Sequence, residues 1–215
     1  MQRNGKKTEK QEIYPSLKRR IIEYYYKPGD ILNEQDLAEE YGVSRTPVRT
    51  ALQELERDQL ISIVPRYGAQ VVSIDFRSIG DLFDVTKRLD PYAARLAVRW
   101  ITPEQLAELK NIVERLDSFK TTDSYKEAIV QDQRFHDIIF EASRNKWLLD
   151  TSERLHIHTE RLWHYCKEYF DDMEIFTRTF RLLVKALEDK DPDAAEKHAS
   201  DHIDDFLSRI RESLF

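Results

Sequence analysis

Cysteine, glycine and long apolar runs are all scarce in this chain. Its 215 residues include a single cysteine, Cys166, and only 5 glycines. One cysteine excludes an internal disulfide framework and favours a reducing compartment. No apolar run approaches the roughly 20 residues of a transmembrane helix, and the polar start is not a secretory signal. We therefore expect a soluble, cytoplasmic protein with no membrane partner. The scarcity of helix breakers favours a mainly α fold.

The net charge of −6 is unevenly distributed along the chain. The part through Asp75 holds 12 basic and 12 acidic residues, so the later part carries the whole negative charge. Within the first part, residues 1–20 contain seven basic and two acidic residues. Residues 1–11 are therefore expected to form a disordered basic arm, which the negative average conceals.

One stretch, residues 42–56, has two different faces when it forms a helix. Three apolar residues recur at helical spacing on one face: Val48, Leu52 and Leu55. Arg45 and Arg49 lie together on another face. Such a helix can bury one side and offer two guanidinium groups to a DNA major groove, where arginine pairs with guanine edges or phosphates. A surface helix with two solvated arginines is an equally good interpretation of this helix alone.

The residues before this stretch predict two further helices. The first runs from Tyr14 to Tyr26 and ends at residues 28–30, Pro-Gly-Asp. The second is capped by Asn33, covers residues 34–41 and stops at Gly42 in a left-handed turn. Two short helices joined by a tight turn, the second with arginines near its start, are typical of a helix-turn-helix.

A β-hairpin is expected directly after the third helix. Residues 60–64 and 69–74 read as strands around a turn at residues 65–68, whose last residue, a glycine, can take positive φ. A hairpin in this place is a wing, and its tip offers Arg66 and Tyr67 to a neighbouring groove or phosphate. A packing element with an exposed tip is the alternative, which we disfavour because a helix-turn-helix precedes the hairpin.

Taken together, these motifs resemble the DNA-binding domain of the GntR family of bacterial transcription regulators, over residues 12–75. The run at residues 44–49, Ser-Arg-Thr-Pro-Val-Arg, is the most specific element. The resemblance implies operator contacts from Arg45, Thr46, Arg49 and the wing glycine. It also implies a contact near residue 35, where the family often has arginine and this chain has glutamine. The DNA-binding residues expected in all are Gln35, Ser44, Arg45, Thr46, Arg49, Arg66, Tyr67 and Gly68.

From residue 76 onward the sequence predicts an antiparallel bundle of six helices. They cover residues 77–101, 103–119, 124–143, 146–169, 173–189 and 192–215. Residues 76–215 resemble the FCD domain, the helical ligand-binding half of the FadR-like branch of the GntR family. The resembling residues include the run at 81–85, Asp132 with Phe135-His136, and His202-Ile203. Six helices rather than seven resemble the VanR-type subgroup. The resemblance implies that this domain binds an effector and forms a homodimer.

In many FCD domains an aspartate and three histidines hold a divalent metal that helps bind a small carboxylate effector. The resemblance places three of these ligands at Asp132, His136 and His202, and the fourth at Phe180, which cannot bind a metal. Three protein ligands plus water or effector still make a workable Zn²⁺ or Ni²⁺ site, and His158 is a candidate replacement. An Asp–His hydrogen bond in a metal-free pocket is equally favoured.

The expected effector pocket departs from the family at Thr86, where an arginine commonly clamps the effector carboxylate. Arg134 or Arg161 could replace that cation, although an ion-paired or solvated face is favoured for both. The pocket candidates are Thr86, Arg88, Arg134, His158, Arg161 and Phe180. Three further histidines fall off the apolar stripes and are expected to be solvated: His156, His164 and His198.

The sequence thus predicts a homodimeric repressor whose affinity for double-stranded operator DNA is controlled by a small-molecule effector. A regulator with an apolar, metal-free pocket is the main alternative. A helical metal-dependent hydrolase is the other, because His136 and Asp137 are adjacent. We disfavour it because that class needs a histidine upstream of the pair, and His136 is the first histidine of the chain.

Overall fold

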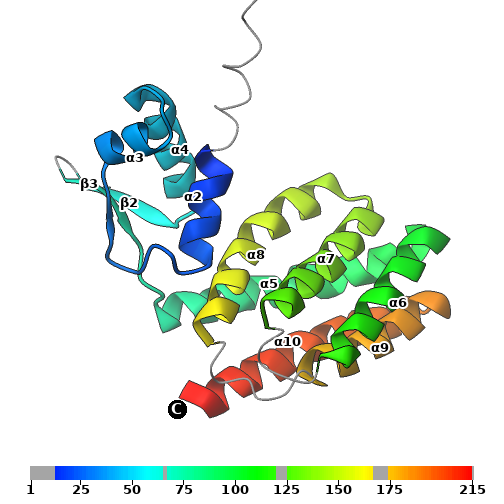
Figure 1. Ribbon diagram of the computed structural model, residues 1–215. Helices are drawn as coiled ribbons and strands as arrows, with labels where there is room; N and C mark the ends of the chain where they lie inside the picture. Colours follow the sequence, from blue (N-terminus) through cyan, green and yellow to red (C-terminus); the bar gives the residue numbers. More distant parts are fainter. Residues whose placement is uncertain (1–12, 65–66, 120–124, 167–173, 215) are drawn as a thin grey trace, which may run out of the picture. The chain divides into compact units, whose positions relative to one another are not determined.

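The computed structural model of the chain describes residues 13–64, 67–119, 125–166 and 174–214, and it divides into two compact units, Met1–Asp75 and Phe76–Phe215. The first unit contains three described helices, α2 (Ile13–Ile22), α3 (Glu34–Glu40) and α4 (Arg45–Arg57). Its strands are β1 (Ile31–Leu32), β2 (Ile61–Val64) and β3 (Gly68–Val71) (Figure 1). The basic arm at residues 1–11 lies outside the described residues.

The core of the first unit forms where α4 packs against α2, α3 and β2. The expected apolar stripe of α4 is buried, and its full set is Val48, Ala51, Leu52 and Leu55. Helix α2 contributes Leu17 and Ile21, which are completely buried. Each aliphatic side chain buried in this way stabilises the fold by about 1.5–3 kcal/mol. Burial of this apolar face therefore fixes how α4 is rotated about its own axis.

A three-stranded antiparallel sheet in the order β1-β3-β2 completes this unit. The expected hairpin is present, with Ile61 opposite Val71 and Val64 opposite Gly68. The third strand, β1, pairs Leu32 with Ala69 and was missed from the sequence. Two residues are too few to show an alternating pattern, so only the fold reveals this strand.

Glycine is required at two turns of this unit. Gly42 follows α3 with φ +64°, as expected for a helix that stops in a left-handed turn. Gly68 opens β3 with φ +115°, and a Cβ there would lie 2.6 Å from the backbone oxygen of Leu32. The second position is doubly constrained, because both the dihedral angle and the neighbouring strand exclude a side chain.

The second unit is a bundle of helices, which confirms the mainly α fold class. Its described helices are α5 (Phe76–Trp100), α6 (Pro103–Ser118), α7 (Tyr125–Ser143), α8 (Lys146–Cys166), α9 (Glu174–Glu188) and α10 (Pro192–Leu214). Several of the expected helix ends, at residues 124, 167–169, 173 and 215, lie outside the described residues. Thr102 caps α6 in a reciprocal capping box with Gln105. None of the helices in the described part of the chain is long and apolar enough to cross a membrane.

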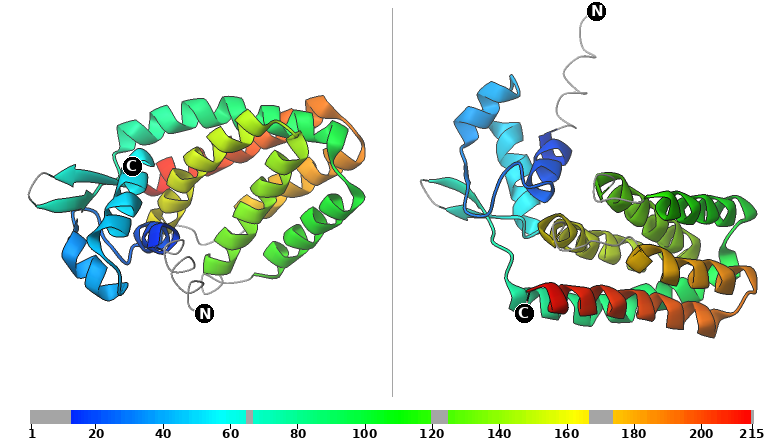
Figure 2. Two further views of the ribbon diagram at one scale, coloured as in Figure 1. Left: turned by 90° about the horizontal axis from the view of Figure 1, so that it is seen from above. Right: turned by 60° about the horizontal axis from the view of Figure 1, so that its bottom comes forward.

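Helix α5 is central to the bundle, since it packs against α7, α8, α9 and α10. Figures 1 and 2 show α10 running alongside α5, with α7 and α8 on another side of it. Four helices that are distant in the sequence therefore meet around α5. Polar side chains on their inner faces are brought together in the interior.

Gly68→Ala is expected to destabilise the first unit by about 1–3 kcal/mol or more, because an unfavourable φ and a backbone clash add together. Urea unfolding followed by circular dichroism should show the loss. Gly80→Ala is the matched control, since Gly80 lies in α5 with open space around it. The control should be neutral or stabilising by roughly 0.5–1 kcal/mol. Equal stability of the two variants would contradict the constraint at Gly68.

Candidate functional site

Two exposed arginines stand on α4 beside its buried stripe. Arg45 is the first residue of the helix and Arg49 follows one turn later, which places both side chains on one side. Their side chains are 62% and 57% exposed. The N-cap residue Ser44 makes no capping hydrogen bond with its side chain. The helix thus begins with two cations directed to solvent.

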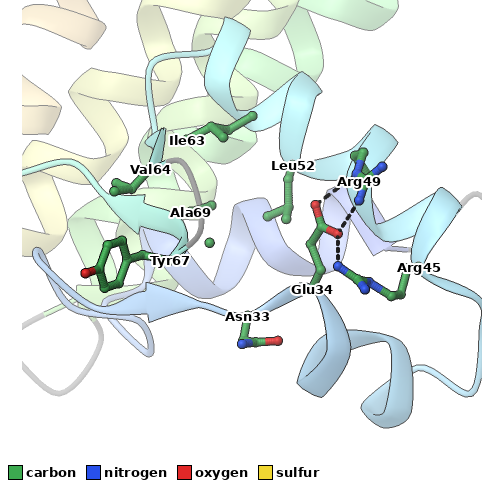
Figure 3. A pocket seen from close by; sticks show the side chains of 10 residues that line it. Asn33, Glu34, Arg45, Arg49, Leu52, Ile63, Val64, Tyr67 and Ala69 are labelled. Atoms are coloured by element: carbon green, nitrogen blue, oxygen red, sulfur yellow. Dashed lines mark hydrogen bonds and ion pairs between the residues drawn. The ribbon is translucent and has the colours of Figure 1, made fainter.

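Glu34 lies between these arginines and binds both (Figure 3). Arg49 Nε donates to Glu34 Oε1 at 3.0 Å, and Arg49 Nη2 donates to Glu34 Oε2 at 2.8 Å. Arg45 Nη2 donates to the same Oε2 at 2.9 Å. The hydrogen bonds from Arg49, ahead of those from Arg45, lower the pKa of Glu34 to about 2 despite its partial burial. Glu34 was not expected from the sequence as a partner of the arginines.

A cavity of about 300 Å³ opens beside the two arginines. Its lining comes from the start of α3, the first turns of α4 and the hairpin. Figure 3 shows Tyr67 on the hairpin side of this cavity and the arginines on the α4 side. Tyr67 is exposed. Cations and an exposed phenol therefore border one concave surface.

The other expected DNA-binding residues occupy the same unit. Gln35 and Thr46 are both exposed. The side-chain nitrogen of Gln35 donates to Glu39 Oε1 at 3.2 Å, and the side-chain oxygen of Gln35 takes no part in that bond. Gly68 begins β3 and contributes to the cavity lining. Arg66 lies outside the described residues.

A second candidate site lies inside the bundle, where five polar side chains form what we call the polar cluster: Asp90, Asp132, His136, His156 and His202. Asp132 and His136 belong to α7, and the other three residues come from α5, α8 and α10. His136 Nε2 and His202 Nε2 each lie 3.8 Å from Asp132 Oδ1. His156 Nε2 lies 3.0 Å from Asp90 Oδ2. The three expected ligands are thus brought together, along with two residues that were not expected there.

Phe180 lies against this cluster. Its ring stacks on Phe135 at 3.7 Å with an interplanar angle of 2°, and it lies 4.4 Å from the ring of His202 at 26°. His202 Nδ1 lies 2.9 Å from Thr179 Oγ1, so its Nε2 is the nitrogen that approaches Asp132. An aromatic stack therefore fills the position where the resemblance implies the fourth ligand, a third histidine.

Burial shifts the pKa values of the cluster toward neutral forms. Burial raises the pKa of Asp132 to about 7 and lowers that of His202 to about 4. Burial also lowers the pKa of His136, and the neighbouring His156 and His202 lower it further. His156 is the exception, because burial lowers its pKa but the nearby carboxylates of Asp90, Asp132 and Asp137 together raise it by more.

The residues of the polar cluster fit a divalent cation. Asp90 Oδ1 and Asp132 Oδ1 are buried and accept no hydrogen bond from any described residue. Imidazole nitrogen with carboxylate oxygen is the donor set that Zn²⁺ and Ni²⁺ take in proteins. The cavity beside the cluster measures about 30 Å³, which is room for an ion or a water molecule.

Comparison with known proteins identifies the chain. The family of bacterial regulatory proteins named gntR matches residues 9–71, and the FCD domain matches residues 81–205. The chain belongs to the GntR family and carries an FCD domain. It is therefore a DNA-binding transcriptional regulator.

Relatives along most of the chain are regulators as well. It is 28% identical over 204 residues to the gluconate operon transcriptional repressor of Bacillus licheniformis, covering 91% of this chain and 82% of the relative. It is 29% identical over 182 residues to the HTH-type transcriptional regulator McbR of Escherichia coli K12, covering 84% and 82%. The solved structure of E. coli McbR/YncC superposes with a TM-score of 0.79 at 25% identity, over 95% of this chain and 97% of that one. These proteins are transcription regulators and not hydrolases, so the enzyme alternative is set aside.

The expectation that the side chain of His156 is solvated was wrong. Its side chain is only 18% exposed, and it lies in the polar cluster. The inner face of α8 there carries Ser152, His156, Thr159 and Trp163 at helical spacing. Because three of these four are polar, the apolar stripe used for the prediction followed a different face. His164 and His198 are also largely buried, with side chains 9% and 21% exposed.

The effector-pocket candidates fall in different places. Thr86 is buried, lines the cavity beside the polar cluster and donates to the Leu82 carbonyl at 3.0 Å. Arg88 is exposed, and Arg134 is ion-paired to Glu108 at 2.7 Å, as expected for a charged outer face. Two further candidates, His158 and Arg161, are not among the residues that line this cavity.

Arg49→Ala is expected to raise the pKa of Glu34 more than Arg45→Ala does, because Arg49 supplies two of the three hydrogen bonds. Carboxyl-carbon NMR titration measures the value in each variant. The pKa of folded Glu34 lies below its ordinary 4.5, so the ion pair stabilises the fold above that pH and is lost as pH falls toward 2. A pKa that stays near 2 in Arg49→Ala would contradict the assignment.

Proposed function

We propose that the chain is a repressor that inserts α4 into the major groove of operator DNA, with its affinity set by an effector in the bundle. One observation carries the first half of this proposal. The buried stripe of α4 holds Arg45 and Arg49 on the solvent side, at the start of the helix, where a recognition helix meets base edges. The protein would act in the cytoplasm, where operator DNA is found.

The arginines suit guanine edges or phosphates. A guanidinium group presents two parallel N–H donors, and a good bidentate contact with guanine contributes about 1–3 kcal/mol of discrimination. Glu34 already occupies one edge of each group. The remaining donors face solvent, together with Tyr67 of the wing and the exposed side chains of Gln35 and Thr46. Contact by these residues would follow the concave surface between α4 and the hairpin.

The unit Phe76–Phe215 is proposed to form the homodimer and to bind a small carboxylate effector. Asp132, His136 and His202 would hold a divalent cation, which would supply a positive centre for the effector carboxylate. Thr86 would lie beside the effector carboxylate from α5, since its side chain lines the same cavity, and the rest of the effector would have to widen that space of about 30 Å³. The dimer is expected to have two states that differ in operator affinity. The effector can change operator binding only to the extent that it binds one of these states more tightly than the other.

A metal-free pocket is the second candidate. The aromatic stack of Phe180 on His202 and Phe135 favours it, because it makes one side of the cluster apolar. Burial of neutral histidines also needs no cation. In this case an apolar effector would pack beside the stack. Metal analysis of protein purified without added metal separates the two candidates.

Arg45→Ala and Arg49→Ala are each expected to weaken operator binding at least tenfold, since each removes a guanidinium group from the DNA-contacting surface of α4. Binding is measured by fluorescence anisotropy on a duplex selected from a random library by the wild-type protein. Arg115→Ala is the matched control, because Arg115 is an equally exposed arginine paired to one glutamate, in the other unit. Unchanged affinity in both α4 variants, with normal circular dichroism, would refute the assignment.

Salt should weaken operator binding steeply. Each phosphate that the protein neutralises contributes a slope of about −0.9 to log K against log salt, so four or more contacts predict a loss of roughly 100-fold or more between 50 and 200 mM. The same anisotropy assay at increasing potassium chloride measures this slope. A flat titration would show that the exposed cations do not meet a DNA backbone.

A further inference from the structure

We propose that His156 is a metal ligand of this chain, in place of the histidine missing at Phe180, and that Asp90 is the carboxylate that positions it. This inference rests on the cation proposed above for the bundle and assigns it a ligand set particular to this chain. The side of the cluster next to Phe180 is closed to a metal ligand. Phe180 offers no lone pair, and its ring is held between Phe135 and His202.

A third imidazole reaches the cluster from another helix, since His156 belongs to α8. The rings of His156 and His136 are 4.9 Å apart and nearly perpendicular. A ligand atom from each of Asp90, His136 and His156 lies within 4.8 Å of the other two. The same holds for Asp132, His136 and His202. Because His136 belongs to both sets, a cation bound to His136 is within reach of His156.

His156 is hydrogen-bonded to Asp90. Asp90 Oδ2 lies 3.0 Å from Nε2 of His156, which leaves Nδ1 with a lone pair for a cation when Nε2 carries the proton. Metal-binding histidines almost always donate their other ring N–H to a carboxylate or carbonyl group, which fixes the ring. Asp90 and His156 show this arrangement, with both side chains largely buried.

Without a cation, the buried polar atoms of the cluster destabilise the fold. Two aspartates and three histidines share the interior of the bundle, and one oxygen of each aspartate accepts no hydrogen bond from a described residue. Buried polar atoms without a partner destabilise a fold by about 1–3 kcal/mol each. A divalent cation would give Asp132 Oδ1 a partner, and its charge would compensate the negative charge of both aspartates.

The test measures metal content. Protein is stripped with a chelator, loaded with Zn²⁺, desalted and analysed by atomic emission. Wild-type protein should retain about one ion per chain, and His156→Ala should retain less than a tenth of that. His158→Ala is the matched control, two residues along the same helix, and should retain the wild-type amount. Retention by His156→Ala, or loss by His158→Ala alone, would overturn the proposal.

Two additional variants keep the test decisive if His156→Ala folds poorly. Adding Phe180→His to His156→Ala should restore the ion, because it returns a histidine to the position that the family uses. Asp90→Asn should weaken Zn²⁺ affinity about 10- to 100-fold in a competition with a chelating dye, as expected for a positioning residue. Failure of both effects would show that His156 and Asp90 pack beside the site without serving it.

A third readout separates this inference from the proposed function. Co²⁺ replaces Zn²⁺ and gives a visible absorption that reports the number and type of ligands. The spectrum should change in His156→Gln and not in His158→Gln. Operator binding is measured in the same samples. Wild-type protein that binds operator and takes up no metal would overturn this inference together with the cation of the proposed function, whereas metal uptake without operator binding would overturn only the DNA-binding half of the proposed function.

Discussion

The burial of one face of α4 is the constraint on which the DNA-binding surface depends. Val48, Leu52 and Leu55 are almost completely excluded from solvent. Together they contribute several kcal/mol, at about 1.5–3 kcal/mol for each side chain, against a typical net stability of 5–15 kcal/mol. A rotation of the helix that exposed them would cost most of that stability. Arg45 and Arg49 therefore face outward because burial of the neighbouring apolar face fixes the rotation of the helix.

Glu34 adds a second constraint to the same surface. Two guanidinium groups one helical turn apart repel each other, and the carboxylate between them compensates that repulsion. It also restricts the rotamers of both arginines, so less side-chain entropy remains to be lost when they meet another partner. The opposing effect is that each donor held by Glu34 must be shared or exchanged before it can contact a base. Operator affinity is the net result of these two effects.

The sequence predicted those elements whose signal is periodic or depends on one residue type. The stripe of α4, the capping residue Thr102 and the turn glycines Gly42 and Gly68 are all found as expected. Strand β1 was missed because two residues carry no period. Glu34 was missed because its partners are 11 and 15 residues away, and a helix start rich in acidic residues already explains its presence.

The histidines show the limit of that approach more clearly. His158 was chosen over His156 because an apolar stripe was assumed to mark the inner face of α8. The face that meets the polar cluster carries serine, threonine and histidine, since a buried polar site needs polar residues inside the bundle. Hydrophobic periodicity therefore fails to identify the inner face of a helix that lines a functional site. Phe180 is the reverse case, because an apolar residue occupies a position expected to bind a metal.

The polar cluster also connects ion binding with helix packing. Its five residues come from α5, α7, α8 and α10, so a cation bound by Asp132 and the three histidines would connect α7, α8 and α10 directly and α5 through Asp90. In the absence of an ion, burial favours neutral forms of Asp132, His136 and His202. A cation reverses this preference for the aspartate and takes the lone pairs of the histidines, so part of its binding energy becomes energy of helix packing. An effector that coordinates such an ion would act on the same four helices. A local contact could then change the helix packing of the whole bundle.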